Sequence, residues 1–297
     1  MSHPDDTMEE HEYLCVDDFM KTLVDARALA SAFELGLIDY VFQNPGVHLD
    51  DLKSAARSDE RGLRYLLDLL AANHVIEENN GEIKLTQSFL RALKFRDLLE
   101  AKLEFANFVA PDVVDHFTTL IHSPQQFGQD SRTFELFCYG RSLEFSPENF
   151  QLTKRWVRIT TALTKYEAQV YLRHHDFSRY RRMLDIGGNS GEFVLRICRK
   201  HPGILGTVFD LPVVCDVGLE HIRSEPEAGR ITFMKGDALM DPLPEGFDLI
   251  PFLLFFRSFR SPEIYIEQLG ASGFHPIDVR KIDLETPFFL VEARKPF

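Results

Sequence analysis

The stretch from Met183 to Lys200 constrains the fold more strongly than any other part of the chain. A short apolar run at 183–186 leads into Gly-Gly-Asn-Ser-Gly at 187–191, and apolar residues then recur with helical period. Glycine tolerates positive φ and lets the backbone approach a ligand closely. The next helix directs its N-terminus at the same place. The stretch therefore predicts a strand, a glycine turn and a helix.

Two later predicted strands each end in an acidic residue. Residues 206–210 end in Asp210, and residues 231–237 end in Asp237. At the edge of a doubly wound sheet, an acid that ends the second strand can accept hydrogen bonds from ribose hydroxyls. Taken alone, Gly187-x-x-x-Gly191 is not the dinucleotide fingerprint and is compatible with a tight turn that binds nothing. The three strand ends together predict a nucleoside-binding site.

These motifs resemble the cofactor site of class I S-adenosylmethionine-dependent methyltransferases. Within that class the chain is similar to the small-molecule O-methyltransferases, a family that includes acetylserotonin O-methyltransferase. The family pattern D-x-G-G-G-x-G corresponds to 185–191, with Asn189 in place of the third glycine. The patterns D-[LIV]-P and G-D-x-[FL] correspond to 210–212 and 236–239. Asparagine is the next best residue for left-handed backbone, so the turn is expected to persist.

The resemblance implies S-adenosylmethionine as cofactor, S-adenosylhomocysteine as its product, and no metal. Glycine backbone would lie near the methionine end of the cofactor, Asp210 would hold the ribose, and Asp237 with Ala238 would lie near the adenine. An upstream tyrosine and tryptophan also match residues that line the cofactor in the family. The predicted cofactor-binding residues are Tyr139, Trp156, Asp185, Gly187, Gly188, Gly191, Asp210, Leu211, Asp237 and Ala238.

The N-terminal part reads as helices followed by a hairpin. Residues 14–43 have helical periodicity, further helices begin near 49 and 58, and Asn79-Asn-Gly81 is a hairpin signal. This order describes a winged helix. DNA binding is disfavoured because the chain has a net charge of −13. The resemblance implies a dimerisation module instead. An alanine-rich helix at 19–37 is expected to leave an apolar patch that a second copy covers.

The predicted architecture is α/β: a Rossmann-like methyltransferase sheet with helices on both faces, preceded by an α-helical winged-helix dimerisation domain. The expected divisions are a disordered tail at 1–13, the winged-helix domain at 14–105, a helical linker that roofs the substrate pocket at 106–180, and the S-adenosylmethionine-binding domain at 181–297. The resemblance implies transfer of a methyl group to a hydroxyl of a small aromatic acceptor.

Composition disfavours several other classes of protein. The acidic net charge argues against nucleic acid and anionic membranes as partners. No apolar run reaches the ~18 residues that a membrane span needs. The four cysteines (Cys15, Cys138, Cys198, Cys215) are scattered, which is typical of a reducing compartment, and a cytoplasmic location is expected. Histidines 174 and 175 have no further ligand at a recognisable spacing, so no metal is expected.

The family pattern breaks after the strand predicted at 247–250. In the family this strand leads to a loop with His-[DN]-[WY], whose histidine takes the proton of the acceptor hydroxyl, but here Pro251 comes directly after the strand. Forty-nine residues follow Asp248, whereas the family's remaining elements need about 60. A βα unit is therefore predicted to be missing, either through an internal deletion or because the functional protein is longer. No catalytic residue is assigned. A non-methylating S-adenosylmethionine-binding relative and a non-catalytic dimeric binding protein remain alternatives.

Overall fold

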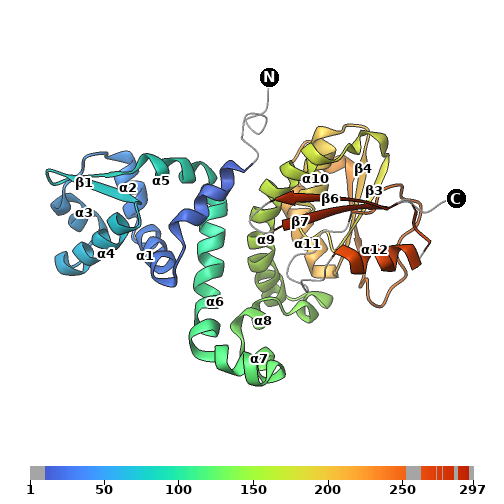
Figure 1. The fold of residues 1–297 in the computed structure, drawn as a ribbon, viewed down its shortest axis with the longest axis horizontal. Helices are drawn as coiled ribbons and strands as arrows, with labels where there is room; N and C mark the ends of the chain where they lie inside the picture. The colour runs from blue at the N-terminus through green and yellow to red at the C-terminus, as the bar shows by residue number, and fades with distance from the viewer. Residues whose placement is uncertain (1–10, 252–261, 272, 276, 284–286, 294–297) are drawn as a thin grey trace. The chain divides into compact units, whose positions relative to one another are not determined.

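The computed structural model describes residues 11–251, 262–271, 273–275, 277–283 and 287–293. The chain divides into two compact units, Met1–Pro251 and Phe252–Phe297. The first unit holds the N-terminal helices, the linker and the parallel sheet, and the second holds one helix and a hairpin (Figure 1). The expected tail at 1–13 falls mostly outside the described residues.

The N-terminal region consists of short helices and a two-stranded hairpin. The elements are a 3₁₀ helix Glu12–Phe19, α1 Leu23–Glu34, α2 Leu37–Gln43, α3 Leu49–Ala56, α4 Glu60–Ala72, β1 Ile76–Asn79 and β2 Glu82–Leu85 (Figure 1). The Thr22 and Asp59 side chains cap α1 and α4 by accepting backbone N–H groups. Asn80 and Gly81 both have positive φ, at 52° and 81°, as a type I′ turn requires. The predicted winged-helix order is confirmed.

The helical stretch expected at 14–43 is interrupted, and the patch expected on its alanine face is wrong. Gly36 adopts a left-handed φ of 70° and separates α1 from α2. Ala26, Leu29 and Ala32 of α1 are buried, because this face packs against α4 and α6 within the same chain. The exposed apolar side chains of this region are instead Leu23, Val24, Leu35 and Phe42.

The region from 87 to 174 is helical, which includes most of the linker predicted at 106–180, and two of its helices are long. The elements are α5 Gln87–Ala92, a 3₁₀ turn Leu93–Phe95, α6 Arg96–His122, α7 Pro124–Asp130, α8 Arg132–Leu136, a 3₁₀ turn Tyr139–Leu143 and α9 Pro147–His174 (Figure 1). Ser146 caps α9 by accepting the backbone N–H of Asn149 at 3.0 Å. Helix α6 packs against both α1 and α9 and continues through the division expected at 105/106.

The parallel sheet places the predicted site residues at one edge. Its elements are β3 Arg182–Ile186, α10 Glu192–Lys200, β4 Leu205–Asp210, α11 Pro212–Ile222 and β5 Ile231–Lys235, with strand order β3-β4-β5. Right-handed crossovers between neighbouring parallel strands place α10 and α11 on the same face of the sheet, and α9 packs against both helices. Helices α10 and α11 therefore cover this face of the sheet, and α9 packs on those two helices.

The fourth predicted strand is reduced to a single bridge. Leu249 pairs in parallel with Met183, on the side of β3 away from β4, and its carbonyl accepts the Leu184 N–H at 2.9 Å. The βα unit predicted to be missing would follow Ile250. Residues 252–261 after this junction lie outside the described residues. In the second unit, α12 Pro262–Ala271 is followed by β6 Ile277–Asp283 and β7 Pro287–Ala293, an antiparallel pair as expected.

Candidate functional site

The glycine turn after β3 has the backbone conformation that its sequence predicts. Gly187, Asn189 and Gly191 have φ values of 67°, 58° and 76°, all in the left-handed region. The Gly187 N–H donates to the carbonyl of Phe209 at 2.8 Å, which ties the turn to the end of β4. The expectation that asparagine can replace the third glycine of the family pattern is confirmed for the backbone.

Asp185 lies buried beneath this turn. A Cβ atom added at Gly188 would lie 2.8 Å from the Asp185 carboxyl carbon, so the turn can pass over Asp185 only because residue 188 is glycine. Asp185 is 3% exposed. Burial, together with the nearby Asp210 carboxylate, raises the pKa of Asp185 to about 8. At neutral pH this pair of carboxyl groups therefore retains a proton.

Asp210 connects the turn to the end of β4. Its Oδ2 accepts the Asn189 backbone N–H at 2.8 Å, and its Oδ1 accepts the Leu211 N–H at 2.7 Å. Burial raises the pKa of Asp210 to about 6, although these two N–H groups oppose the rise. An ionised carboxylate offers about four lone-pair positions. Two positions remain for hydroxyl donors such as those of a ribose.

The segment after β5 is hydrogen-bonded through its backbone to the end of β4. The Gly236 N–H donates to the Asp210 carbonyl at 3.0 Å. The Asp237 Oδ1 accepts the Leu239 N–H at 2.9 Å, and Asp241 Oδ2 accepts the Asp237 N–H at 2.8 Å. Ala238 is exposed. Asp237 thus shapes a tight loop beside Asp210.

Tyr139 and Trp156, which the resemblance predicts to line the cofactor, lie against each other. Their ring centroids are 5.4 Å apart at an interplanar angle of 72°. Trp156 is 5% exposed and packs in a cluster that includes Val214 and Val217 of α11, and Leu211 packs against the same cluster. Tyr139 is 41% exposed. The aromatic pair therefore lies next to the loop after Asp210.

Sequence reasoning missed two threonines on α9 that contact the glycine turn. Asn189 Nδ2 donates to Thr160 Oγ1 at 2.6 Å, and the Thr161 hydroxyl lies 2.7 Å from Ser190 Oγ. Thr160 follows Trp156 by one helical turn, so the two residues share a face of α9. That i, i+4 spacing is the signal that could have identified Thr160.

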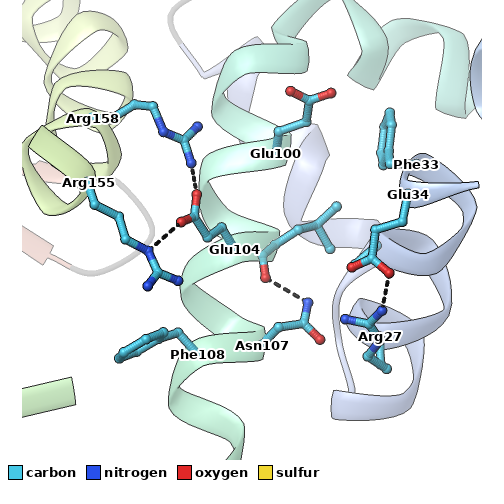
Figure 2. Close-up of a pocket in the computed structure, with 11 residues that line it drawn as sticks. Arg27, Phe33, Glu34, Glu100, Glu104, Asn107, Phe108, Arg155 and Arg158 are labelled. Carbon is cyan, nitrogen blue, oxygen red and sulfur yellow. Dashed lines mark hydrogen bonds and ion pairs between the residues drawn. The ribbon is translucent and has the colours of Figure 1, made fainter. Parts of the chain in front are cut away.

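A separate cavity of about 380 Å³ lies between α1, α6 and α9 (Figure 2). Its charged side chains are paired: Arg155 and Arg158 bind Glu104, Arg27 binds Glu34, and Glu100 binds Arg96, which lies outside the cavity lining. Arg158 lies two residues from both Trp156 and Thr160, on roughly the opposite side of α9. This cavity is therefore distinct from the strand-end site, and its ion pairs do not call for a charged ligand.

Among the described residues, no group of three or more His, Cys, Asp and Glu side chains is arranged to hold a metal ion. His175, one of the two histidines considered as ligands, is 8% exposed and its ring stacks on Tyr180 at 5.8 Å. No helix within the described part of the chain is long and apolar enough to cross a membrane.

Known proteins that are similar to this chain are methyltransferases, the class that its strand-end motifs resemble. Residues 121–254 match the family model of the O-methyltransferase domain. The chain is 30% identical over 228 residues to the O-methyltransferase SfmM3 of Streptomyces lavendulae, an alignment covering 75% of this chain and 65% of SfmM3. It is 28% identical over 225 residues to the N,N-dimethyltransferase OxyT of Streptomyces rimosus, covering 74% of this chain and 62% of OxyT.

The fold also matches a solved structure over nearly its whole length. Human N-acetylserotonin methyltransferase in complex with SAM aligns with a TM-score of 0.64 at 18% identity, covering 98% of this chain and 99% of that one. The chain therefore shares the fold of this methyltransferase. The match of residues 121–254 to the O-methyltransferase domain, together with the likeness to SfmM3, confirms that the motifs resemble this family. It spans less than two thirds of the length of SfmM3 and OxyT.

Proposed function

We propose that the chain binds S-adenosylmethionine and transfers its methyl group to a hydroxyl of a small aromatic acceptor. Asp210, with Leu211, holds the ribose, and the backbone at Gly187, Gly188 and Gly191 receives the methionine portion. Asp237 and Ala238 lie at the adenine, and Tyr139 with Trp156 lines the cofactor beside them. Asp185 supports the turn from below.

One contact carries this proposal: the hydrogen bond from the Asn189 backbone N–H to Asp210 Oδ2 at 2.8 Å. Through this contact the glycine turn lies beside Asp210, the acid proposed to bind the ribose, at the ends of two adjacent strands. Doubly wound α/β folds bind nucleoside ligands at such strand ends. Asp210 keeps lone pairs for further donors, and the turn is free of side chains at 187, 188 and 191. The residues present therefore fit the cofactor.

The aromatic surroundings of Trp156 favour an aromatic acceptor. Phe105, Phe108, Phe137 and Phe150 all pack against the Trp156 cluster, and aromatic rings recognise flat partners through stacked or edge-to-face contacts. When bound, the cofactor supplies an electrophilic methyl group on its sulfonium. The protein orients the acceptor oxygen toward it, and such positioning lowers the barrier substantially. The group that accepts the hydroxyl proton is not assigned among the described residues.

The test is methyl transfer to a panel of phenols and aromatic amines. The chain is incubated with S-adenosylmethionine, and S-adenosylhomocysteine and methylated product are quantified by mass spectrometry. Transfer to phenols is the expected result. Transfer to amines alone would change the proposed acceptor from a hydroxyl to an amine. The amines are included because the chain is 28% identical to the N,N-dimethyltransferase OxyT.

The junction at Ile250–Pro251 favours a second candidate function, that of a cofactor-binding relative that does not transfer methyl groups. The loop that carries the family's proton acceptor has no counterpart in the sequence, because Pro251 comes directly after the predicted strand. Calorimetric binding of S-adenosylmethionine without turnover of any acceptor would support this second candidate or a non-catalytic dimeric binding protein. If insertion of a βα segment at this junction restored turnover, that result would support methyl transfer as the function.

We expect a two-fold homodimer formed through residues 14–105. Val24 and Phe42 are 58% and 56% exposed in this region, and a dimer interface would remove such apolar side chains from water. Sedimentation equilibrium at micromolar concentration should give twice the mass of one chain. The double variant Val24→Asp/Phe42→Asp should be monomeric, whereas Val114→Asp on α6, at a side chain 70% exposed, should stay dimeric. A monomeric wild type, or the reverse behaviour of the variants, would contradict the expectation.

The absence of nucleic-acid and membrane partners and the cytoplasmic location stay predictions from charge and cysteine pattern. The basic side chain of Arg64 on α4 is already paired with Glu78 at 2.7 Å, which reduces the positive charge that a DNA-reading helix would present.

A further inference from the structure

The side chain of Asn189 is held in one orientation by Thr160. Asn189 Nδ2 donates to Thr160 Oγ1 at 2.6 Å. The Thr160 hydroxyl hydrogen is directed to the carbonyl oxygens of Trp156 and Val157, at 3.2 and 3.0 Å. Its oxygen can therefore only accept from residue 189, which requires the amide nitrogen on that side. The carbonyl oxygen of the amide must face the other way.

That carbonyl oxygen, Asn189 Oδ1, is buried and meets no hydrogen-bond donor among the described residues. Buried polar atoms without a partner are rare and call for an explanation. The family pattern has glycine at this position, so the acceptor is a property of this chain. It lies in the turn that is proposed to receive the methionine portion of the cofactor.

The neighbouring groups determine what kind of donor suits this place. Asp185 and Asp210 contribute two carboxyl groups at the same strand ends, and neither forms an ion pair with any described residue. Because this pair retains a proton at neutral pH, the turn combines one negative charge with an unsatisfied carbonyl oxygen, and no cation among the described residues neutralises that charge. A positively charged donor complements it best.

We infer that Asn189 Oδ1 accepts a hydrogen bond from the α-ammonium group of the cofactor, with Thr160 as the residue that orients the amide. This inference rests on the proposed function. Asn189 thereby makes the site selective for nucleosides that carry an amino-acid portion. Thr160 is a positioning residue, since it acts through Asn189.

The test compares S-adenosylhomocysteine with 5′-methylthioadenosine, which keeps the adenosine and the thioether but has no amino-acid portion. Asn189→Gly removes the amide, adopts the left-handed φ without strain and keeps the N–H that donates to Asp210. By calorimetry, this variant should bind S-adenosylhomocysteine about ten-fold more weakly, the effect of one hydrogen bond to a charged group. Its affinity for 5′-methylthioadenosine should change less than about two-fold, since that ligand lacks the ammonium group.

Thr160→Val supplies the second arm, because it removes the acceptor that orients the amide. It should weaken S-adenosylhomocysteine binding on its own but add nothing in the Asn189→Gly background, as expected for two residues that act as one unit. An equal loss for both ligands in Asn189→Gly, or no loss for either, overturns the inference. A wild-type chain that binds neither ligand overturns the proposed function itself, and with it this inference, so the two failures are distinguishable.

Discussion

Asp210→Ala should weaken binding of S-adenosylhomocysteine by about 1.5–3 kcal/mol, the range for hydrogen bonds to a charged group. The Asp210 carboxylate uses one lone pair of each oxygen for the N–H groups of Asn189 and Leu211. The remaining lone pairs are those proposed to accept from ribose hydroxyls. Removing the carboxylate therefore removes the ribose acceptor and also frees the turn that it anchors. Isothermal calorimetry measures the loss directly.

The matched control is Asp216→Ala on α11, because this carboxylate pairs with Lys235 at 2.6 Å and is not part of the predicted site. It should leave the affinity within about two-fold, as surface ion pairs contribute little. Asp210→Asn, of nearly unchanged volume, separates loss of charge from loss of packing. Wild-type affinity in both Asp210 variants would remove this residue from the cofactor site.

The wild-type affinity should also depend on pH in a defined direction. Burial raises the pKa of Asp210 to about 6, and the ionised form is the better acceptor. The contribution of Asp210 to binding is therefore present above pH 6 and declines as the pH falls through that value. The affinity of Asp210→Ala should not decline over this pH range, so the same calorimetric titration of the variant tests whether Asp210 causes the decline.

The turns at the strand ends were predictable because their conformation is determined by the residues within each turn. The glycine turn depends on φ values that few residues tolerate, so its sequence almost determines its shape, including the left-handed Asn189. The type I′ turn at Asn80 and Gly81 was predictable for the same reason. The positions of Asp210 and Asp237 followed from the rule that parallel strands end at one edge.

Features that depend on packing between distant segments were not predictable. The periodicity of 14–43 was correct, but it could not indicate that Ala26, Leu29 and Ala32 would be covered by α4 and α6 of the same chain. The contact between Thr160 and Asn189 joins residues 29 positions apart. Asn189 belongs to the glycine motif, but nothing in that motif indicates a contact with α9.

Asp112→Asn should destabilise the first unit by about 2–3 kcal/mol, because a buried carboxylate with many donors cannot be replaced by an amide without leaving some of them unpaired. Asp112 of α6 is 2% exposed. Its Oδ2 accepts from Ser131 Oγ at 2.6 Å and from the Thr133 N–H and hydroxyl at 2.9 and 2.6 Å, while Oδ1 accepts the Arg132 N–H at 2.9 Å. An asparagine presents an NH₂ group to donors that need an acceptor.

The consequence reaches the candidate site because these donors begin α8. Leu136 at the end of α8 packs in the Trp156 cluster, and Phe137 lies against the Trp156 ring at 6.0 Å. Tyr139 lies two residues further along the chain. Loosening the start of α8 should therefore increase the mobility of Tyr139 and Trp156 as well as lower the free energy of unfolding. Hydrogen exchange of 131–143 and urea unfolding measure the two effects, with the exposed Asp115→Asn on the same helix as the matched control.

The effect of Asp112→Asn should also fade in acid. Burial alone would raise the pKa of Asp112, but hydrogen bonds from Ser131 and Thr133 outweigh it and lower the pKa to about 2. In the unfolded chain an aspartate titrates near pH ~3.9. The stabilisation by the ionised group is therefore complete above that pH and is lost as the pH falls from about 4 toward 2. The difference in unfolding free energy between wild type and Asp112→Asn should shrink over the same interval. A difference that stays constant between about pH 6 and pH 2.5 would show that the carboxylate charge is not what holds α8 to α6.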